Sequence, residues 1–385
     1  MKKQPVIIHS FPSWDAPYIK STIELIKEVN NDYDWYFIDY AYTLKDLIFN
    51  RSAPFKNIVG FNKRIRNFIN KKGVSIKIVS LPPILPFNSV PRYFKPFIER
   101  VNLFILERYL TKFRSRFNKQ RPIVINALNP YYGLKLKDTL DARKTLYYCY
   151  DNIDAMPWAS TTYSDSEKEF CNHADHVLTT SKGLLAKLSP NSRSISEINN
   201  GVNNNVFYQR EKTITDTVFI DYIGSLDDRL DVELLSKMIN SFPEYRFRFF
   251  GKVNERSVFN QIEHNSNVKN YGQIDQRQLA ELLSNSAVCI IPFIKNDFTK
   301  YIYPLKINEY LSLGKPVVST RFADLSDFEE IISIGNTHSQ FIDCLKNELS
   351  SNSKEKIDAR VAYAKRNNWA SRAAQLCDLL SQDAA

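Results

Sequence analysis

Residues 303–320 have the sequence YPLKINEYLSLGKPVVST, which joins the signals of a helix start, an anion site and a buried strand. It predicts a helix that begins at Pro304, carries Lys306 and Glu309, and leads into a buried strand. Proline suits the first helical turn, where its missing N–H would be unpaired, and the N–H groups at a helix start attract anions. We therefore expect the N–H groups that begin with Leu305, together with the Lys306 ammonium, to bind a phosphate group.

Glu309 extends the predicted phosphate site to a second part of the ligand. About one helical turn after Lys306, its carboxylate is expected to accept hydrogen bonds from two neighbouring hydroxyl groups, as a ribose presents them beside its diphosphate. Together the two residues indicate a nucleotide sugar. The run PLKxxEYLxxGKPVV resembles the donor-binding helix of the GT-B glycosyltransferases, in particular those of family four. The alternative is an ordinary buried helix–turn–strand unit, because Leu305, Ile307 and Leu311 would serve any core, although a core needs neither Lys306 nor Glu309.

Two further segments of the second half resemble parts of the donor site in this family. Residues 221–231, DYIGSLDDRLD, carry Gly224 at a strand end and Arg229 on the loop that faces the donor phosphates in similar enzymes. Arg229 is expected to give the diphosphate a bidentate contact, the alternative being an ordinary surface arginine. Residues 270–274, NYGQI, match the position at which the family holds the nucleotide base. The complete set expected to bind the nucleotide sugar is Gly224, Arg229, Gly272, Gln273, Tyr301, Tyr303, Pro304, Leu305, Lys306 and Glu309.

The chain departs from the family pattern at two places. Retaining members of family four have an acid eight residues before the glutamate of the helix, and here that position is Tyr301. The family's histidine-containing loop after the fifth strand is replaced by NALNPYYG at residues 126–133. The resemblance therefore does not imply whether the enzyme retains or inverts the anomeric configuration.

The catalytic candidates depend on that outcome. An inverting enzyme needs a base that takes the proton of the attacking hydroxyl. Asp151, and after it Asp154, follow a predicted strand at 145–148, and ligands bind at the carboxyl ends of parallel strands. The alternative for this pair is one helix cap and one solvated acid. In a retaining enzyme the leaving diphosphate would steer the acceptor, while Lys306 and Arg229 neutralise its charge.

The first loop, SFPSWDAP at residues 10–17, is expected to reach the same region from the first predicted strand. We assign acceptor binding to Ser10, Trp14 and Asp15 in this loop. His9 or Asp15 is a further candidate for the base.

Short apolar runs alternate with amphipathic helices in two halves of the chain, a pattern typical of parallel sheets covered on both faces. We expect strands at 6–8, 35–38, 76–79, 123–125, 145–148, 177–179, 218–223, 247–250 and 288–292, and helices at 19–29, 232–239, 276–284 and 369–380. The resemblance implies an α/β GT-B fold with two Rossmann-like domains that face each other across a cleft. The first is expected over 1–202 and the second over 203–367, with a linker at 203–216 and a C-terminal helix, 368–385, that returns to the first domain.

Positive charge is concentrated in residues 43–121. This zone holds 18 Lys/Arg and three acids, so it carries +15, whereas the rest of the chain carries −5. Within it, Phe97, Val101 and Phe104 recur at helical spacing among basic residues and lead into Phe113 and Phe117. A basic amphipathic helix indicates an anionic membrane surface. The alternative is a solvated face over a core helix; nucleic acid is not expected, because no nucleic-acid-binding motif accompanies the charge.

The sequence also predicts the compartment. The five cysteines are odd in number and widely spaced, which indicates reduced thiols, and the first apolar run stops at His9, too soon for a signal peptide or an anchor. No apolar run of about 20 residues could span a bilayer. We expect no metal and no cofactor other than the UDP- or GDP-linked donor sugar, since the helix start and two cations replace a divalent ion.

These observations lead to one main hypothesis and two alternatives. The main one is an EC 2.4-class glycosyltransferase that moves a sugar from a nucleoside diphosphate sugar to a membrane-associated, lipid-linked glycan acceptor in bacterial surface polysaccharide synthesis. It would be peripheral on the cytoplasmic face of the membrane. The first alternative is a non-catalytic GT-B-like protein that binds an anionic lipid or polymer, which Tyr301 in place of an acid favours. The second is a nucleotide-sugar epimerase or phosphorylase of the same fold, which the basic first domain disfavours.

Overall fold

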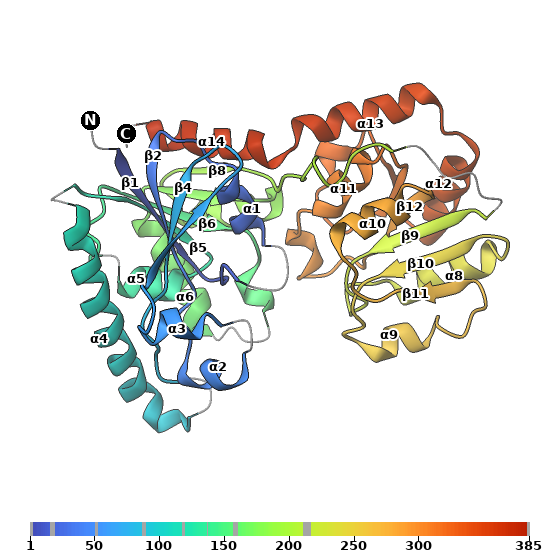
Figure 1. The fold of residues 1–385 in the computed structure, drawn as a ribbon. Helices are drawn as coiled ribbons and strands as arrows, with labels where there is room; N and C mark the ends of the chain where they lie inside the picture. The colour runs from blue at the N-terminus through green and yellow to red at the C-terminus, as the bar shows by residue number, and fades with distance from the viewer. Residues whose placement is uncertain are drawn as a thin grey trace. The chain divides into compact units, whose positions relative to one another are not determined.

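The computed structural model describes residues 3–15, 20–50, 53–86, 90–117, 120–136, 138–156, 161–210 and 217–382. The chain forms two compact units (Figure 1), one of residues 1–199 with 372–385 and the other of residues 200–371. The sequence places these boundaries after residue 202 and before residue 368. At the start of the second unit, a Cβ added to Gly201 would lie 2.6 Å from the backbone nitrogen of Trp369. Glycine is therefore needed where the two ends of the second unit come together.

The first unit is built on an eight-stranded sheet in the order β3-β4-β2-β1-β5-β6-β7-β8. The strands are β1 (Gln4–Ser10), β2 (Tyr33–Ile38), β3 (Ile65–Ile69), β4 (Ser75–Val79), β5 (Ile123–Ala127), β6 (Lys144–Cys149), β7 (His176–Thr179) and β8 (Ile195–Glu197). Neighbouring strands pair in parallel, except that the edge strand β3 pairs antiparallel with β4. The expectation of a parallel sheet was therefore wrong at this edge, because only residues 70–74 separate β3 from β4, and so short a connection can join only antiparallel strands.

Helices pack against the first sheet, and α4 runs along one side of the first unit (Figure 1). They are α1 (Ser21–Lys27), α2 (Leu44–Phe49), α3 (Phe55–Ile58), α4 (Lys95–Arg114), α5 (Pro130–Lys135), α6 (Thr161–His173) and α7 (Lys182–Leu188). Leu106, Leu110 and Phe113 of α4 share an apolar core with Ile7 of β1 and with Phe117. Phe113 and Phe117 thus belong to the core, which corrects their assignment to the basic amphipathic face.

The C-terminal helix α14 (Trp369–Ser381) returns to the first unit, as expected. The Lys144 ammonium at the start of β6 donates to the carbonyl oxygens of Leu379, at 3.1 Å, and Gln382, at 2.8 Å. These bonds satisfy the last carbonyls of the helix with a cation, which also suits the negative end of the helix dipole.

The second unit contains a six-stranded parallel sheet in the order β11-β10-β9-β12-β13-β14. Its elements are β9 (Phe219–Ile223), α8 (Val232–Ser241), β10 (Arg246–Phe250), α9 (Arg256–Asn260), β11 (Val268–Asn270), α10 (Gln276–Leu283), β12 (Ser286–Ile291), α11 (Leu305–Ser312), β13 (Val317–Thr320), β14 (Ser333–Gly335), α12 (His338–Ser350) and α13 (Lys354–Arg366). The Asp231 carboxylate begins α8 by accepting from the N–H of Leu234 at 2.9 Å. This is the repeated strand–helix order of a Rossmann-like unit.

The stretch predicted as a linker is in part a packed element of the second unit. Phe207 is fully buried in its core. Ser312 of α11 hydrogen-bonds to the carbonyl of Phe207 and, at 3.0 Å, to the side chain of Asn204. Residues 203–210 therefore belong to the fold rather than to a linker, and residues 211–216 lie outside the described residues.

Two expectations about the whole chain concern its cysteines and membrane-spanning helices. All five cysteines are free thiols and four of them are buried, which confirms the expectation of unpaired, mostly buried cysteines. Within the part of the chain that the structure describes, no helix combines the length and the apolarity that crossing a bilayer requires.

Candidate functional site

The start of α11 brings Lys306 and Glu309 together as the sequence predicts. Pro304 is the N-cap residue, and the Lys306 ammonium lies 3.1 Å from the Glu309 carboxylate. The Lys306 side chain is 40% exposed and that of Glu309 only 5%. A carboxylate buried to this degree needs a charged or hydrogen-bonding partner, and Lys306 supplies it from the solvent side. The helix start thus presents a cation and a hydrogen-bond acceptor next to each other.

The backbone at this helix start differs from the expectation. The N–H of Leu305 donates to the carbonyl of Tyr303 and the N–H of Ile307 to that of Pro304, both at 2.9 Å. The N–H groups of Leu305 and Ile307, which were assigned to phosphate binding, are therefore used by the turn itself. This corrects that part of the prediction. A proline N-cap has no side-chain acceptor to satisfy these groups, so the backbone closes on itself.

Helix α11 is tied to one edge of the second sheet. The Tyr310 hydroxyl accepts from the N–H of Ile223, the last residue of β9, at 2.8 Å. Strands β9, β10, β11 and β12 are parallel, so their carboxyl ends meet at one edge, where open α/β sheets bind ligands. Gly224 follows β9 and Gly272 follows β11 at this edge. The structure therefore brings these predicted residues to one side of the sheet.

Gly224 and Gly251 allow two of these loops to approach closely. Gly224 has φ +146°, and its N–H donates to the carbonyl of Phe250 at 3.1 Å. A Cβ added to Gly251 would lie 1.8 Å from the Gly224 carbonyl oxygen. Two loops at the edge thus fit only as a glycine pair. Gly251 was missed from the sequence because the glycine directly follows a strand and belongs to no longer motif.

Arg229 is held in place by its own loop. Its guanidinium contacts both carboxylate oxygens of Asp227, at 2.8 and 2.6 Å, and lies 5.5 Å from the ring centroid of Phe293. Its carbonyl accepts from the N–H of Ile294, just after β12, at 2.8 Å. The side chain is 25% exposed, so it is positioned at the same sheet edge but paired with Asp227. Contact with a diphosphate would compete with this bidentate pair.

The loop after β11 contributes an aromatic side chain that sequence reasoning missed. Tyr271 is 38% exposed and stacks on Phe250 with ring centroids 5.0 Å apart. Gly272 has φ +68°, and its N–H donates to the side chain of Asn270 at 2.9 Å, while Gln273 is exposed. A partly exposed ring beside the positions assigned to the nucleotide base offers a stacking surface. The sequence signal was the aromatic residue directly before the turn glycine.

Tyr301 and Tyr303 have different surroundings. Tyr303 is 9% exposed, its ring lies 5.5 Å from that of Phe328, and its hydroxyl accepts from the Asn308 amide at 3.1 Å. Tyr303 therefore serves the core around α11. Tyr301 ends a short 3-10 turn, Thr299–Tyr301, and the Lys300 ammonium lies 5.0 Å from its ring centroid.

In the first unit, the loop after β1 is fixed by residues from β2 and β3. The N–H of Trp14 donates to the Asp39 carboxylate at 2.8 Å, and the indole lies 5.0 Å from the Phe37 ring. Arg66 forms a two-point ion pair with Asp15, one of whose bonds is 3.0 Å. The Ser10 hydroxyl is buried and donates to the carbonyl of residue 12 at 3.1 Å. The side chains of Ser10 and Asp15 thus shape the loop, and Asp15 is paired rather than poised as a base.

Asp39, at the end of β2, is a titratable group that the sequence analysis missed. Its side chain is 1% exposed, and burial raises its pKa to about 6, although the N–H groups of Trp14 and Tyr40 and the charge of Arg66 oppose this. An acid with a pKa near neutrality is a frequent feature of functional sites. Only its position after a buried strand could have indicated it.

Asp151 and Asp154 follow β6 at the equivalent edge of the first sheet. The Asp151 carboxylate accepts from the N–H of Asn152 at 2.9 Å. Asp154 is 48% exposed and lies 2.9 Å from the Lys187 ammonium. Burial alone would raise the pKa of Asp154, but hydrogen bonds from Ser164 and Lys187 outweigh it and lower the pKa. Asp154 is thus ionised at neutral pH and a weak base, which leaves Asp151 as the first candidate.

A buried network supports this segment from behind. Glu167 is 2% exposed; it accepts from the Tyr147 hydroxyl at 2.6 Å and lies 3.2 Å from Lys187. Lys187 also donates to the Asn152 side chain at 2.6 Å. Burial alone would lower the pKa of Lys187, but the charges of Glu167 and Asp154 raise it. Lys187 therefore stays charged and holds the segment in place.

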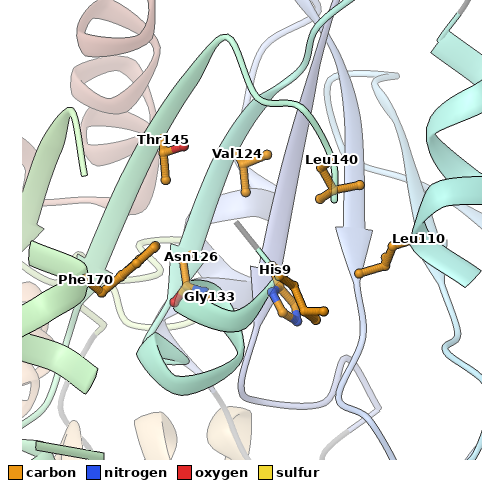
Figure 2. A pocket seen from close by; sticks show the side chains of 9 residues that line it. His9, Leu110, Val124, Asn126, Gly133, Leu140, Thr145 and Phe170 are labelled. Carbon is orange, nitrogen blue, oxygen red and sulfur yellow. The ribbon is translucent and has the colours of Figure 1, made fainter. Parts of the chain in front are cut away.

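His9, the alternative base, lies inside the first unit. Figure 2 shows its ring in a small cavity with Asn126 of β5, Leu110 of α4 and Phe170 of α6. Its exposure is 6%, and burial lowers its pKa to about 4. The ring is neutral at physiological pH but surrounded by core residues, so the side chain of His9 is buried although His9 is the next-to-last residue of β1.

Among the described residues, no group of three or more His, Cys, Asp or Glu side chains is arranged to hold a metal ion. Independence of a metal stays a prediction.

Comparisons with known proteins agree with this geometry. Residues 220–347, which include α11 and the glycine loops, match the family model of glycosyl transferases group 1. TuaH of Bacillus subtilis (strain 168), named as a teichuronic acid biosynthesis glycosyltransferase, is 22% identical over 178 residues. That match covers 43% of this chain and 45% of TuaH, so the chain matches less than half of this curated relative.

Solved structures match over nearly the whole chain. Sucrose-phosphate synthase of Thermosynechococcus elongatus has a TM-score of 0.69 at 16% identity and covers 98% of both chains. The UDP-forming trehalose-phosphate synthase of Burkholderia vietnamiensis has a TM-score of 0.68 at 9% identity, with 100% of this chain and 99% of that one covered. HepE of Anabaena, in complex with UDP and glucose, has a TM-score of 0.64 at 12% identity, with 99% and 100% covered. The chain is therefore a GT-B fold protein. More specifically, residues 220–347 match the group 1 glycosyltransferase model, in agreement with the resemblance seen in the sequence.

Proposed function

We propose that this protein is a glycosyltransferase that takes its sugar from a nucleoside diphosphate sugar bound at the carboxyl edge of the second sheet. The observation that carries the proposal is the pair of Lys306 and Glu309 at the start of α11, 3.1 Å apart and inside the region that matches group 1 glycosyltransferases. HepE, which shares the fold, was solved with UDP and glucose, and this supports UDP as the first nucleotide to test.

In this proposal the two residues divide the donor between them. Glu309 is buried and fixed, so its carboxylate accepts hydrogen bonds from the ribose hydroxyls. Lys306 is more exposed, so its ammonium turns from Glu309 toward the diphosphate and neutralises the charge that develops as the sugar leaves. Arg229 adds a second cation at the same edge, and Tyr271 offers its ring to the base. No metal or other cofactor takes part.

The acceptor belongs to the first unit in this proposal. If configuration is inverted, Asp151 takes the proton of the attacking hydroxyl; if it is retained, the departing diphosphate does so. Trp14, whose backbone Asp39 holds, contributes an aromatic surface for a sugar ring. The name of TuaH supports a bacterial surface polysaccharide as the product, and the +15 charge of residues 43–121 supports an acceptor carried by a lipid at the cytoplasmic face of the membrane.

Nucleotide binding tests the donor half directly. The purified protein is screened with UDP, GDP and TDP by thermal shift, and the affinity of the best nucleotide is then measured by calorimetry. Lys306→Met should weaken binding of the diphosphate by about 1.5–3 kcal/mol but leave the nucleoside unaffected, because a charged hydrogen bond is lost. Glu309→Gln should instead abolish the preference for the ribonucleotide over its 2′-deoxy form.

Lys237→Met is a matched control in the same unit. Lys237 pairs with Glu233 one helical turn away, as Lys306 pairs with Glu309, but lies on α8. Replacing Lys237 should change neither the affinity for the diphosphate nor the affinity for the nucleoside. Equal affinity of wild type and Lys306→Met for the diphosphate would remove Lys306 from the site. Absence of binding of every nucleotide and nucleotide sugar would instead favour the non-catalytic alternative.

A further inference from the structure

Exposed apolar side chains are concentrated in one part of the first unit. Among the described residues, thirteen large hydrophobic side chains are exposed, and ten of them lie between Leu44 and Phe104. Single exposed hydrophobic residues are normal on a protein surface, but such a concentration marks a contact surface. The segment coincides with most of the basic zone 43–121.

Helix α4 shows that these side chains are not accidental exposures. Its buried positions, Asn102, Leu106 and Leu110, define the side that packs on the sheet. Phe97 and Phe104 are two helical turns apart on the opposite side, and they are 63% and 62% exposed. An outward side of a soluble helix is normally polar. In Figure 1, α4 runs along the outside of the first unit, so the side opposite its buried positions faces away from the core.

Helix α2 carries the second part of this surface. No residue of α2 is buried, and Ile48 and Phe49 are 76% and 74% exposed. The helix is formed by a capping box of Thr43 and Asp46 rather than by packing. A helix with exposed apolar side chains and no buried residue is explained if those side chains have another partner.

The turn from α3 to β3 follows α2 in the chain and contacts α4. Phe61 in this turn is 81% exposed. The guanidinium of Arg64, at the end of the turn, lies 5.8 Å from the ring centroid of Tyr109 on α4. At the other side, the N–H of Leu44 on α2 donates to the carbonyl of Ile84 at 2.9 Å, and residue 85 exchanges two hydrogen bonds with Asn102 of α4. We call the exposed side chains of Ile48, Phe49, Phe61, Phe97 and Phe104 the docking face.

The charges around the docking face identify its partner. Lys45, Lys63, Arg100 and Arg108 are exposed within the same segments, and the zone as a whole carries +15. A second copy of the chain would bring these positive charges against each other, which is unfavourable. Nucleic acid matches the charge but offers no apolar layer for aliphatic side chains such as Ile48. An anionic bilayer has both a negative surface and an apolar layer below it.

We propose that the docking face inserts its apolar side chains into the interfacial layer of an anionic membrane, while the neighbouring lysines and arginines bind the lipid phosphates. The inference deepens the proposed function, because a lipid-linked acceptor would be presented at this surface. Binding by both charge and insertion differs from binding by charge alone in one measurable way. It persists in part at salt concentrations that screen surface charges.

The test is sedimentation of the full chain with vesicles of phosphatidylcholine, with and without phosphatidylglycerol, at low and high salt. Wild type should bind the anionic vesicles and keep part of that binding at high salt. The pairs Ile48→Ser with Phe49→Ser, and Phe97→Ser with Phe104→Ser, should each reduce binding about tenfold, because two large apolar groups are lost in each. Arg100→Gln with Arg108→Gln should lose mainly the part that salt removes.

Tyr208→Ser is the matched control, since Tyr208 is an exposed aromatic residue, at 48%, in the second unit. It should bind vesicles like wild type. All variants replace exposed side chains, so circular dichroism and the thermal shift with nucleotide should be unchanged. A failure of vesicle binding with intact nucleotide binding would overturn this inference alone and leave the donor site standing.

Three other results would also overturn it. If high salt abolishes wild-type binding entirely and the serine pairs bind like wild type, the protein binds the vesicles by charge alone. A change from dimer to monomer in the serine pairs, without an effect on vesicles, would mean that a second copy covers the face. Tighter binding of a DNA or RNA duplex than of vesicles, lost in the arginine pair, would identify nucleic acid.

Discussion

Replacing Lys187 by methionine should destabilise the first unit by about 3–5 kcal/mol. The ammonium of Lys187 lies 3.2 Å from the buried carboxylate of Glu167 and 2.9 Å from that of Asp154. Among the described residues it is the cation that pairs with Glu167, whose side chain is 2% exposed. Methionine keeps most of the length of the side chain, so the change mainly removes the charge.

The magnitude follows from the buried carboxylate that the variant leaves without a cation. Breaking a buried ion pair by removing one partner costs roughly 3–5 kcal/mol. An exposed surface pair is worth at most about 1 kcal/mol. The loss of stability in Lys187→Met should therefore be several times the loss at a surface pair.

Urea unfolding of wild type and Lys187→Met at pH 7 measures this loss. Adding Glu167→Gln to the variant should recover most of the loss, because the amide needs no cation. Lys27→Met is the control: Lys27 pairs with Glu24 on α1, but its side chain is 37% exposed, so its loss should cost less than about 1 kcal/mol. A loss no larger than that of Lys27→Met, or no recovery in the double variant, would refute the reasoning.

Three other predictions follow from buried groups. Because burial raises the pKa of Asp39 from 3.8 to about 6, its folded form holds a proton longer than its unfolded form, so the free energy of unfolding should fall as pH rises from 4 to 6; Asp39→Asn should flatten this fall in urea titrations. Arg248→Met should cost about 3–5 kcal/mol in urea unfolding, because Asp221, 0% exposed and paired with Arg248 at 2.6 Å, would lose its cation. Gly251→Ala should cost about 1–3 kcal/mol and weaken nucleotide binding in calorimetry, since its Cβ would meet the Gly224 carbonyl at 1.8 Å.

The parts of the fold predicted from the sequence are those that local patterns determine. Strands β1, β5 and β9 are short apolar runs, and α8 and α10 bury residues at helical spacing behind an aspartate cap, so each was predicted within a few residues. Helices α2 and α3 and strand β3 were missed. They bury little and carry polar residues among apolar ones, so no period of 3.6 or 2 is visible in them.

In the candidate site, too, only the contacts that local patterns determine were predictable. Lys306 and Glu309 lie three residues apart on one helix, so the sequence alone brings them together. In the first unit, Trp14 meets Asp39 and Asp15 meets Arg66 across 25 and 51 residues of chain. Those meetings depend on the order of the strands in the sheet, which no local pattern contains. Asp39 and Lys187 were therefore missed, and Asp15 was assigned to the acceptor although the fold pairs it with Arg66.

The two sheet edges use ion pairs of opposite design, and this difference bears on how each acts. At the second sheet the carboxylate of Glu309 is buried, and the cation, Lys306, is 40% exposed. At the first sheet the cation, Lys187, is 16% exposed, and the carboxylate of Asp154 is 48% exposed. Lys306 can leave its pair for a diphosphate if the ribose hydroxyls then donate to the buried carboxylate of Glu309, which would otherwise lose its partner. The more exposed partner is thus a cation where a diphosphate is proposed to bind, and a carboxylate beside Asp151, the proposed base, where an acceptor hydroxyl is proposed to bind.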